Sequence, residues 1–303
     1  TIFTENIALD TAVAEWIANE TAATETYGDI NTWDVRAITD FSGLFNGHSS
    51  FNSDISNWDV SNGTNFSSMF RSATSFNQNI GNWDVSSGTT FSQMFLSANV
   101  FNQNIGEWDV SSGTDFRHMF YGADAFDQNI GNWDVSSGEF FGGMFRSASS
   151  FNQDIGAWDV SSGNNFGGMF NQANAFNQDI GSWDVSAGTN FSFMFSGADA
   201  FNQDIGSWDV SSGTTFYVMF KGADAFNQNI GNWDVSGTAT LTDMFTDAEL
   251  MQSNLGFSET PTSADFNRTI FTERTALDAA VAEWISNETA ATEAYGDINT
   301  WDV

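Results

Sequence analysis

Residues 76–100 read FNQNIGNWDVSSGTTFSQMFLSANV, and the chain repeats this 25-residue unit along most of its length. A fixed period of 20–50 residues is typical of a solenoid, a propeller or another repeat array. Units of 25 residues are too short for a four-stranded propeller blade, so we expect one solenoid coil per unit, with a closed toroid as the less favoured alternative. Nine tryptophans mark the repeat: Trp33, Trp58, Trp83, Trp108, Trp133, Trp158, Trp183, Trp208 and Trp233.

The apolar residues inside one unit predict the path of a coil. Trp83 and Val85 alternate as they would on one face of a short strand. Residues 86–88, Ser-Ser-Gly, predict a turn, and the apolar spacing i, i+3, i+4 within residues 91–95 predicts one helical turn. We therefore expect a leucine-rich-repeat-like solenoid of about nine coils, each made of a short strand, a turn and one helical turn. The nine tryptophans would then form a buried structural ladder.

The composition excludes several classes of protein. The net charge is −32, from 39 acidic and seven basic residues, and a chain this acidic is repelled by nucleic acid and by anionic membranes. There is no cysteine, and no apolar run is long enough to span a bilayer. No Ser/His/Asp set, paired acid–base motif or phosphate-binding loop stands out, so we expect neither an enzyme nor a bound cofactor.

The two ends of the array differ from its middle. Leu9, Val13, Trp16 and Ile17 have amphipathic helical spacing, which predicts a cap helix within residues 1–30. The repeats then occupy residues 31–257, ending in an atypical terminal coil. Residues 258–268 contain the single proline and have the composition of a linker.

Residues 269–303 repeat residues 1–35, with 30 of 35 positions identical, and so predict the start of a second module. The sequence stops inside a coil, which favours a portion of a longer tandem array. We expect the second helix to pack onto a following identical module, in the same chain or in a neighbouring subunit, and head-to-tail repetition of that contact gives a filament. Independent modules on a flexible string are the alternative. The assembly residues are Leu277, Val281, Trp284 and Ile285.

The unit F-N-Q-[DN]-I-G-x-W-D-V-S…M-F-x-x-A resembles the short-repeat branch of the BspA-like leucine-rich-repeat surface proteins, over about residues 28–257. That branch reads W-D-V-S-x-V-T-x-M-x-x-M-F, whereas Gly88 and Phe91 stand here where it has Val and Met. The resemblance implies a leucine-rich-repeat-like solenoid at a cell surface, used for attachment or scaffolding, and it implies no catalytic residues.

Two polar columns accompany the repeat. An aspartate follows every tryptophan of the series, and we expect it to accept hydrogen bonds from the following turn, with a column of Ca²⁺ ions as the weaker alternative. The Ca²⁺ candidates are Asp59, Asp84, Asp109, Asp134, Asp159, Asp184, Asp209 and Asp234. At the register of Asp54 and Asn79 the chain uses Asp and Asn interchangeably, so that position needs a hydrogen-bonded turn and not a charge.

Two classes of function follow. The first is an extracellular structural or adhesive module of a long surface fibre, favoured by the tandem modules. The second is a solenoid that recognises a glycan, a protein or an ice-like surface, the last suggested by a broken threonine column that includes Thr64, Thr89 and Thr114. The position just after Met-Phe varies and would line one edge of the stack: Arg71, Leu96, Tyr121, Arg146, Asn171, Ser196 and Lys221.

Overall fold

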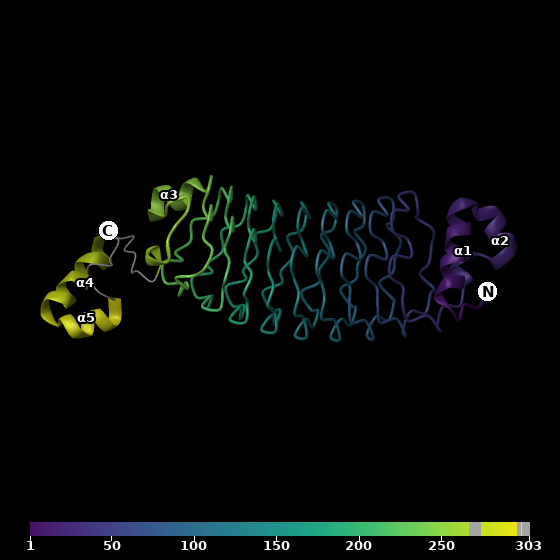
Figure 1. Ribbon diagram of the computed structural model, residues 1–303, viewed down its shortest axis with the longest axis horizontal. Coiled ribbons are helices and arrows are strands. Elements are labelled where there is room, and N and C mark those ends of the chain that lie inside the picture. Colours follow the sequence, from purple (N-terminus) through teal and green to yellow (C-terminus); the bar gives the residue numbers. More distant parts are fainter. Residues whose placement is uncertain (267–273, 296–297, 299–303) are drawn as a thin grey trace.

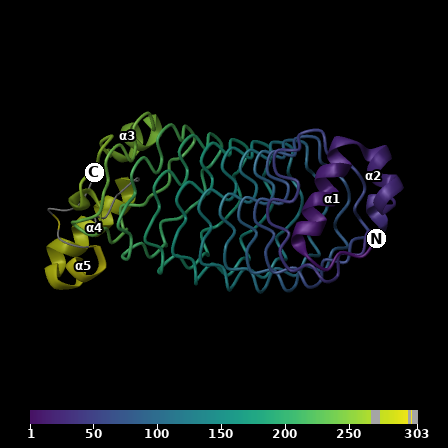
Figure 2. The ribbon, with the colours of Figure 1, turned by 45° about the vertical axis from the view of Figure 1, so that its right-hand side comes forward.

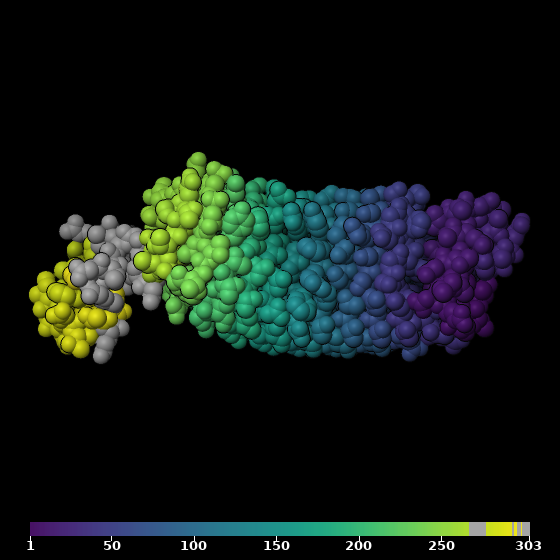
Figure 3. Space-filling model, viewed as in Figure 1, coloured from purple at the N-terminus to yellow at the C-terminus, as the bar shows by residue number. Residues whose placement is uncertain are grey.

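The computed structural model describes residues 1–266, 274–295 and 298. The coils form one long stack, with two helices at its N-terminal end and α3 at its other end, and Figure 3 shows the stack as a continuous rod. A second helix pair, α4 and α5, lies beyond α3 (Figure 1). The helices are α1 (Asn6–Ala18), α2 (Glu20–Tyr27), η1 (Ile30–Thr32), α3 (Glu249–Leu255), η2 (Ser263–Asp265), α4 (Arg274–Ser286) and α5 (Glu288–Tyr295).

Backbone hydrogen bonds join neighbouring coils along one side of the stack. The N–H groups of Phe66, Ser68, Phe70 and Ser72 donate to carbonyl oxygens of the next coil at 2.7–3.0 Å. The same pattern recurs with the 25-residue step, and we call residues 65–72 and their equivalents the ladder segment. One parallel bridge per pair of coils marks it, from Asp40↔Asn65 to Thr215↔Thr240. The tandem repeat predicted from the sequence is therefore built as a stack of hydrogen-bonded coils.

The sequence predicted a helical turn after each Ser-Ser-Gly, and this prediction is wrong. The Met69 N–H donates to the Phe66 carbonyl at 3.2 Å, and the Ala73 N–H donates to the Phe70 carbonyl at 3.0 Å. Ser68 and Ser72, the third residues of these two turns, have φ of 58° and 56°, as in type II turns. Two consecutive turns give the same apolar spacing as a helix, but they leave alternate N–H groups free to bond to the next coil.

The expected strand at Trp83 and Val85 is also absent, because the described residues contain isolated bridges and no strand. The bridges lie in the ladder segment instead. On the tryptophan side, side chains replace backbone bonds: the Trp133 Nε1–H donates to the Ile105 carbonyl of the preceding coil at 3.0 Å. The Asn77 side-chain oxygen likewise accepts the backbone N–H of Asn102 at 2.9 Å.

Aromatic columns fill the interior. Within a coil Phe120 and Phe126 stack at 4.0 Å, and between coils Phe120 and Phe145 stack at 5.7 Å. Trp133 and Trp158 are parallel at 6.5 Å, and all nine tryptophans of the ladder are only 1–4% exposed. The indoles are therefore spaced more widely than the Phe120 column, and Figure 2 shows the coils of the stack following one another in an oblique view.

Both ends of the stack are covered. At the N-terminal end Trp16 of α1 meets Trp33 edge-on at 5.8 Å, and Leu9 and Val13 are buried beside it. At the other end Phe266 stacks on Trp233 at 6.4 Å.

The segment that we expected to be a linker takes part in the C-terminal cover. The Phe245 N–H, which would otherwise face a further coil, donates to the Glu259 carbonyl at 2.9 Å. Residues 259–266 therefore satisfy the exposed edge of the last coil, as an unpaired ladder edge requires.

We expect Trp133→Ala to lower the free energy of unfolding by about 3–5 kcal/mol, because it removes a buried indole from a column with neighbours on both sides. Chemical denaturation followed by circular dichroism measures the loss. Asn132→Ala is the matched control, since Asn132 is exposed and Ala157 already stands at the same register one coil later. A cost below about 1 kcal/mol for Trp133→Ala would contradict a packed indole column.

Candidate functional site

Sequence variation on the ladder segment is confined to its outward side. Phe66, Met69 and Phe70 point inward and are fully buried, and their equivalents in later coils are the same residue types with few exceptions. We call the outward positions, those of Asn65, Ser67, Ser68, Arg71 and Ser72 and their equivalents, the ladder face. Its occupants differ from coil to coil. The described basic side chains on it are Arg71, Arg117, His118, Arg146 and Lys221.

The register of Ser68 has a left-handed backbone in every coil from Gly43 to Asp243, with φ between 55° and 67°. Glycine adopts this conformation without strain, whereas bulky and β-branched residues do so at a cost. His118, Phe193 and Val218 nevertheless occupy it. Strain tolerated for the sake of a side chain is a reason to look for a site there.

A groove of about 350 Å³ lies on the ladder face between two of these bulky residues. Its floor is made of glycines where other coils carry side chains, and His118 with two arginines closes one end while Phe193 closes the other. The lining residues are Arg117, His118, Gly142, Arg146, Asn165, Gly167, Gly168, Asn190, Ser192 and Phe193. Gly143 lies beneath the His118 ring, because a Cβ there would fall 2.1 Å from the His118 Nδ1 atom.

Two arginines at the first end are held by aromatic rings. The Arg117 guanidinium lies 5.0 Å from the Phe140 ring centroid and makes paired hydrogen bonds to Asp115 at 2.9 and 2.6 Å. The Arg146 guanidinium lies 5.0 Å from the Tyr121 ring centroid and has no ion pair within the described ranges. Arg146 thus offers a positioned positive charge that the protein itself does not neutralise.

His118 is a neutral neighbour of these arginines. Burial lowers the pKa of its imidazole, and the charges of Arg146 and Arg117 lower it further. Its Nδ1 atom is buried and has no hydrogen-bond partner among the residues that the structure describes. The imidazole therefore adds a polar ring to the groove near neutral pH, and no charge.

The opposite end of the groove is aromatic. Phe193 is 40% exposed and meets Tyr217, 37% exposed, edge-on at 5.2 Å with an interplanar angle of 85°. Between the two ends, the Asn190 amide donates to the Asn165 side-chain oxygen at 3.1 Å, and the Ser192 and Thr215 hydroxyls are 2.8 Å apart. The groove can therefore present positive charge, an apolar ring and several amide or hydroxyl groups to one small ligand.

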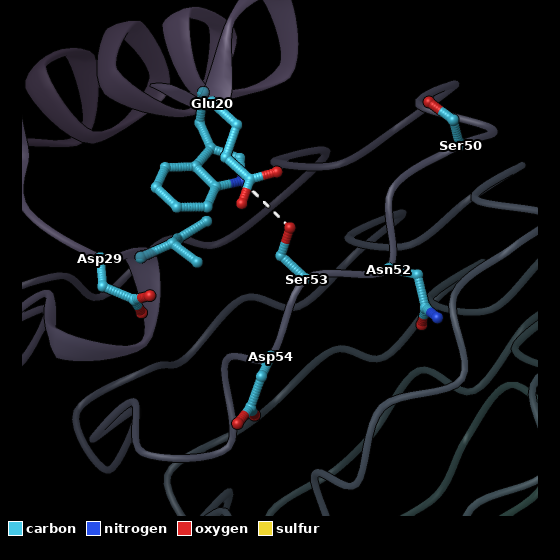
Figure 4. A pocket seen from close by; sticks show the side chains of 8 residues that line it. Glu20, Asp29, Ser50, Asn52, Ser53 and Asp54 are labelled. Carbon is cyan, nitrogen blue, oxygen red and sulfur yellow. Dashed lines mark hydrogen bonds between the residues drawn. The ribbon is translucent and has the colours of Figure 1, made fainter. Parts of the chain in front are cut away.

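A larger hollow of about 410 Å³ lies where α1 and α2 meet the first coils (Figure 4). Its polar groups are engaged locally: the Trp16 Nε1–H donates to the Ser53 hydroxyl at 3.0 Å, and Asp54 accepts from the Ser56 N–H at 2.9 Å. Asp29 caps the turn at Asn31 in the same way. We interpret this hollow as the seam between the cap and the coils.

The aspartates that follow the tryptophans accept hydrogen bonds from the serine two residues later. Asp134 Oδ1 accepts the Ser136 N–H at 3.0 Å and the Ser136 hydroxyl at 2.6 Å. The hydrogen bond from the serine hydroxyl, more than the backbone one, lowers the pKa of the aspartates that share this arrangement, Asp84, Asp109, Asp134, Asp159, Asp184 and Asp209. Asp59 has the same bonds to Ser61, and Asp34 pairs with Arg36, which lowers its pKa to about 2.

The Ca²⁺ alternative gains no support from this geometry, since no three acidic or histidine side chains gather as a metal site in the described part of the chain. Asp234 lacks the serine bonds seen in the earlier coils.

In the second polar column, Asn79 and Asp154 each accept the N–H of a glycine two residues on, at 3.0 and 2.9 Å. Either residue type makes this bond.

The threonine column does not form a free hydroxyl array. The Thr89 and Thr214 hydroxyls donate to carbonyl groups of the preceding coil at 3.1 and 2.9 Å. The variable series from Arg71 to Lys221 does lie in one register of the ladder face, as predicted. That series does not include the register just before Met, where His118 and Phe193 border the groove. The sequence signal for that register is the glycine pair that recurs at 142–143 and 167–168.

The predicted assembly residues lie on α4; residues 269–273, 296–297 and 299–303 of that second module fall outside the described residues. Leu277, Val281 and Trp284 are half-buried, and Ile285 is 78% exposed. No helix in the described ranges has the length and apolar character needed to cross a membrane.

A family model described as "Mycoplasma protein of unknown function, DUF285" matches residues 11–126, 103–198 and 178–284. The chain belongs to this family. Three overlapping matches along one chain also show that it is a repeat protein. No curated protein and no solved structure matches the chain. The family description names no activity, so the function has to be argued from the ladder face.

The aspartate column predicts a dependence of stability on acid pH. The pKa of Asp134 is below its ordinary value of 3.8 in the folded protein, so its ionised form stabilises the fold above about pH 4. That contribution is lost as the pH falls through the lowered pKa. We therefore expect Asp134→Asn to reduce the difference in melting temperature between pH 5 and pH 2, measured by calorimetry.

Asp154→Asn is the matched control, because Asn already stands at that register in Asn79, and we expect it to leave the acid dependence unchanged. Addition of a chelator should leave the melting temperature of the wild type unchanged as well, since serine groups already bind the carboxylates. A drop of several degrees with chelator would favour the Ca²⁺ column instead.

Proposed function

We propose that this chain is a non-catalytic structural and adhesive module of an extracellular repeat protein, and that the ladder face is the surface through which it attaches. In this proposal the coil stack is a leucine-rich-repeat-like solenoid akin to the BspA-like surface proteins. The repeat unit F-N-Q-[DN]-I-G-x-W-D-V supports that kinship, although the turns at Ser68 and Ser72 replace the expected helical turn.

The observation that carries the proposal is the contrast between the ladder face and the rest of the coil. Inward residues and the Asn, Asp and Ser residues of the tryptophan side recur from coil to coil, and most of their hydrogen bonds hold the stack together. Ladder-face side chains do not recur in this way, and they include every described Lys and Arg side chain of the coils except Arg36, which pairs with Asp34 at 2.7 Å. Exposed Arg and aromatic residues are the types enriched at binding surfaces.

The second part of the proposal concerns assembly. Helices α4 and α5 reproduce the contacts of α1 and α2: the Tyr295 hydroxyl donates to Glu283 at 3.1 Å, as the Tyr27 hydroxyl does to Glu15 at 3.0 Å. Trp284 differs from its counterpart Trp16, because its buried Nε1–H has no partner among the described residues. We infer that residues 269–303 open a further module whose coils supply that partner, giving identical modules head to tail.

We expect the ladder face to be required for attachment. Purified chain should block adherence of cells that carry the protein, and a variant with Arg71, Tyr121, Arg146, Phe193 and Lys221 changed to Ser should block it at least about tenfold less well. The matched control changes five exposed residues on the tryptophan side to Ser: Asn57, Asn82, Glu107, Asn132 and Asn232. Equal potency of the two variants would contradict the proposal, as would failure of antibodies against the chain to label intact cells.

We also expect a following module to supply a hydrogen-bond acceptor for the Trp284 Nε1–H. Extending residues 1–303 with a second copy of residues 36–268 completes the next module, because residues 269–303 repeat residues 1–35. Hydrogen exchange of the Trp284 indole should then slow to the rate of Trp16, which serves as the internal reference. An unchanged rate would contradict the inferred module, and small-angle scattering of the same protein separates a stiff fibre from a flexible string.

A further inference from the structure

We propose that the groove between His118 and Phe193 binds an acidic sugar, a pyranose ring that carries a carboxylate, as part of a surface glycan. This proposal rests on the proposed function, because it names the ligand of one part of the ladder face. The charge, the shape and the hydrogen-bonding groups of the groove support it.

The charge favours an anionic ligand. Arg146 lies at the groove without an acidic partner, and Arg117, although paired with Asp115, faces the same space. A guanidinium binds a carboxylate through paired, charge-assisted hydrogen bonds. The net charge of the chain is −32, but at physiological salt charges more than about 8 Å away are largely screened, so nearby arginines decide what binds.

The shape favours a single ring. His118 and Phe193 lie three coils apart, or about 14 Å at the usual spacing of paired strands, and both ends of the space between them are closed by side chains. A floor of three glycines, Gly142, Gly167 and Gly168, brings backbone to the groove. The exposed Phe193 ring offers an apolar face of the kind against which the C–H face of a sugar packs.

The hydrogen-bonding groups favour a sugar over a peptide. An extended peptide docks by pairing with a free sheet edge. Here the N–H groups of His118, Gly143 and Gly168 already donate to the next coil at 2.7–3.0 Å, so no such edge faces the groove. The side chains of Asn165, Asn190 and Ser192 line the groove instead, as partners for sugar hydroxyls.

The choice of residues at the left-handed register supports the same conclusion. Glycine would be the unstrained residue throughout, yet only three of the nine coils use it: Gly43 near the cap, and Gly143 and Gly168, which His118 and Phe193 flank. The arrangement opens a space and closes its ends at the expense of backbone strain. Stability of the stack alone gives no reason for it.

Calorimetric titration of the full chain tests the proposal. The probes are trigalacturonate, its methyl ester, which has the same rings without the charge, a trisaccharide ending in sialate, and a glutamate peptide of matched charge. We expect at least one acidic sugar to bind, and at least tenfold more tightly than both the ester and the peptide. Absence of binding by both acidic sugars overturns the proposal, and so does equal binding of the peptide.

Two substitutions with matched controls locate the site. Gly168→Phe fills the floor with a residue that the fold accepts at the equivalent Phe193, and Gly43→Phe repeats it far from the groove, at a φ of 67° against 65°. Arg146→Gln removes the unpaired charge, and Arg36→Gln removes a positive charge of the coils outside the ladder face.

We expect Gly168→Phe and Arg146→Gln to weaken sugar binding at least tenfold, and the two controls to leave it within twofold. The two Gly→Phe variants should lower the melting temperature equally, because both place Phe at a left-handed φ. Equal losses in the controls would overturn the groove as the site. If acidic sugars fail to bind but the ladder-face variant still loses attachment, this inference is wrong and the proposed function stands. If the sugar binds and attachment is unaffected, the proposed function is wrong.

Discussion

The hydrogen bonds from the ladder segment to the next coil are the constraint on which the rest of the structure depends. Alternate N–H groups, such as those of Phe66, Ser68 and Phe70, donate to the neighbouring coil, and the N–H of Met69 closes a turn within its own coil. This division requires a left-handed residue at fixed places in every coil. Every coil must therefore follow the same path, and residues 25 positions apart must meet.

This constraint separates residues that have to repeat from residues that are free to vary. A buried ring such as Phe120 contacts equivalents on both sides, so one altered residue leaves two neighbours badly packed. The residue type at Asn77 is constrained almost as strongly, because its side chain makes a hydrogen bond between coils in place of a backbone bond. The outward side chains of the ladder segment escape both demands, and basic and aromatic residues have collected there.

The sequence predicted the period, the buried aromatic columns and the capping role of the first helix, because these depend on which residues recur and at what spacing. It did not predict the turns, since Phe91, Met94 and Phe95 have the same spacing in a helix and in two consecutive type II turns. The left-handed residues could not be predicted either, because Ser and Gln at positions 68 and 93 are not residue types that indicate a positive φ. The groove was missed because its two ends come from coils 75 residues apart, His118 and Phe193, and only the coil stack brings them to one face.

The covers at both ends of the stack determine how a longer protein of this kind can be built. Phe266 occupies the place above Trp233 where another indole would stack, and the Glu259 carbonyl takes the bond that a further coil would accept. A tenth coil therefore cannot simply be added, and the stack is a closed unit in the way that capped repeat arrays are. In the proposed array, greater length comes from whole modules, each with its own cap helix and its own ladder face. If each module presents one groove of modest affinity, tandem modules bind a repetitive glycan far more tightly than one module does, because every further contact is intramolecular.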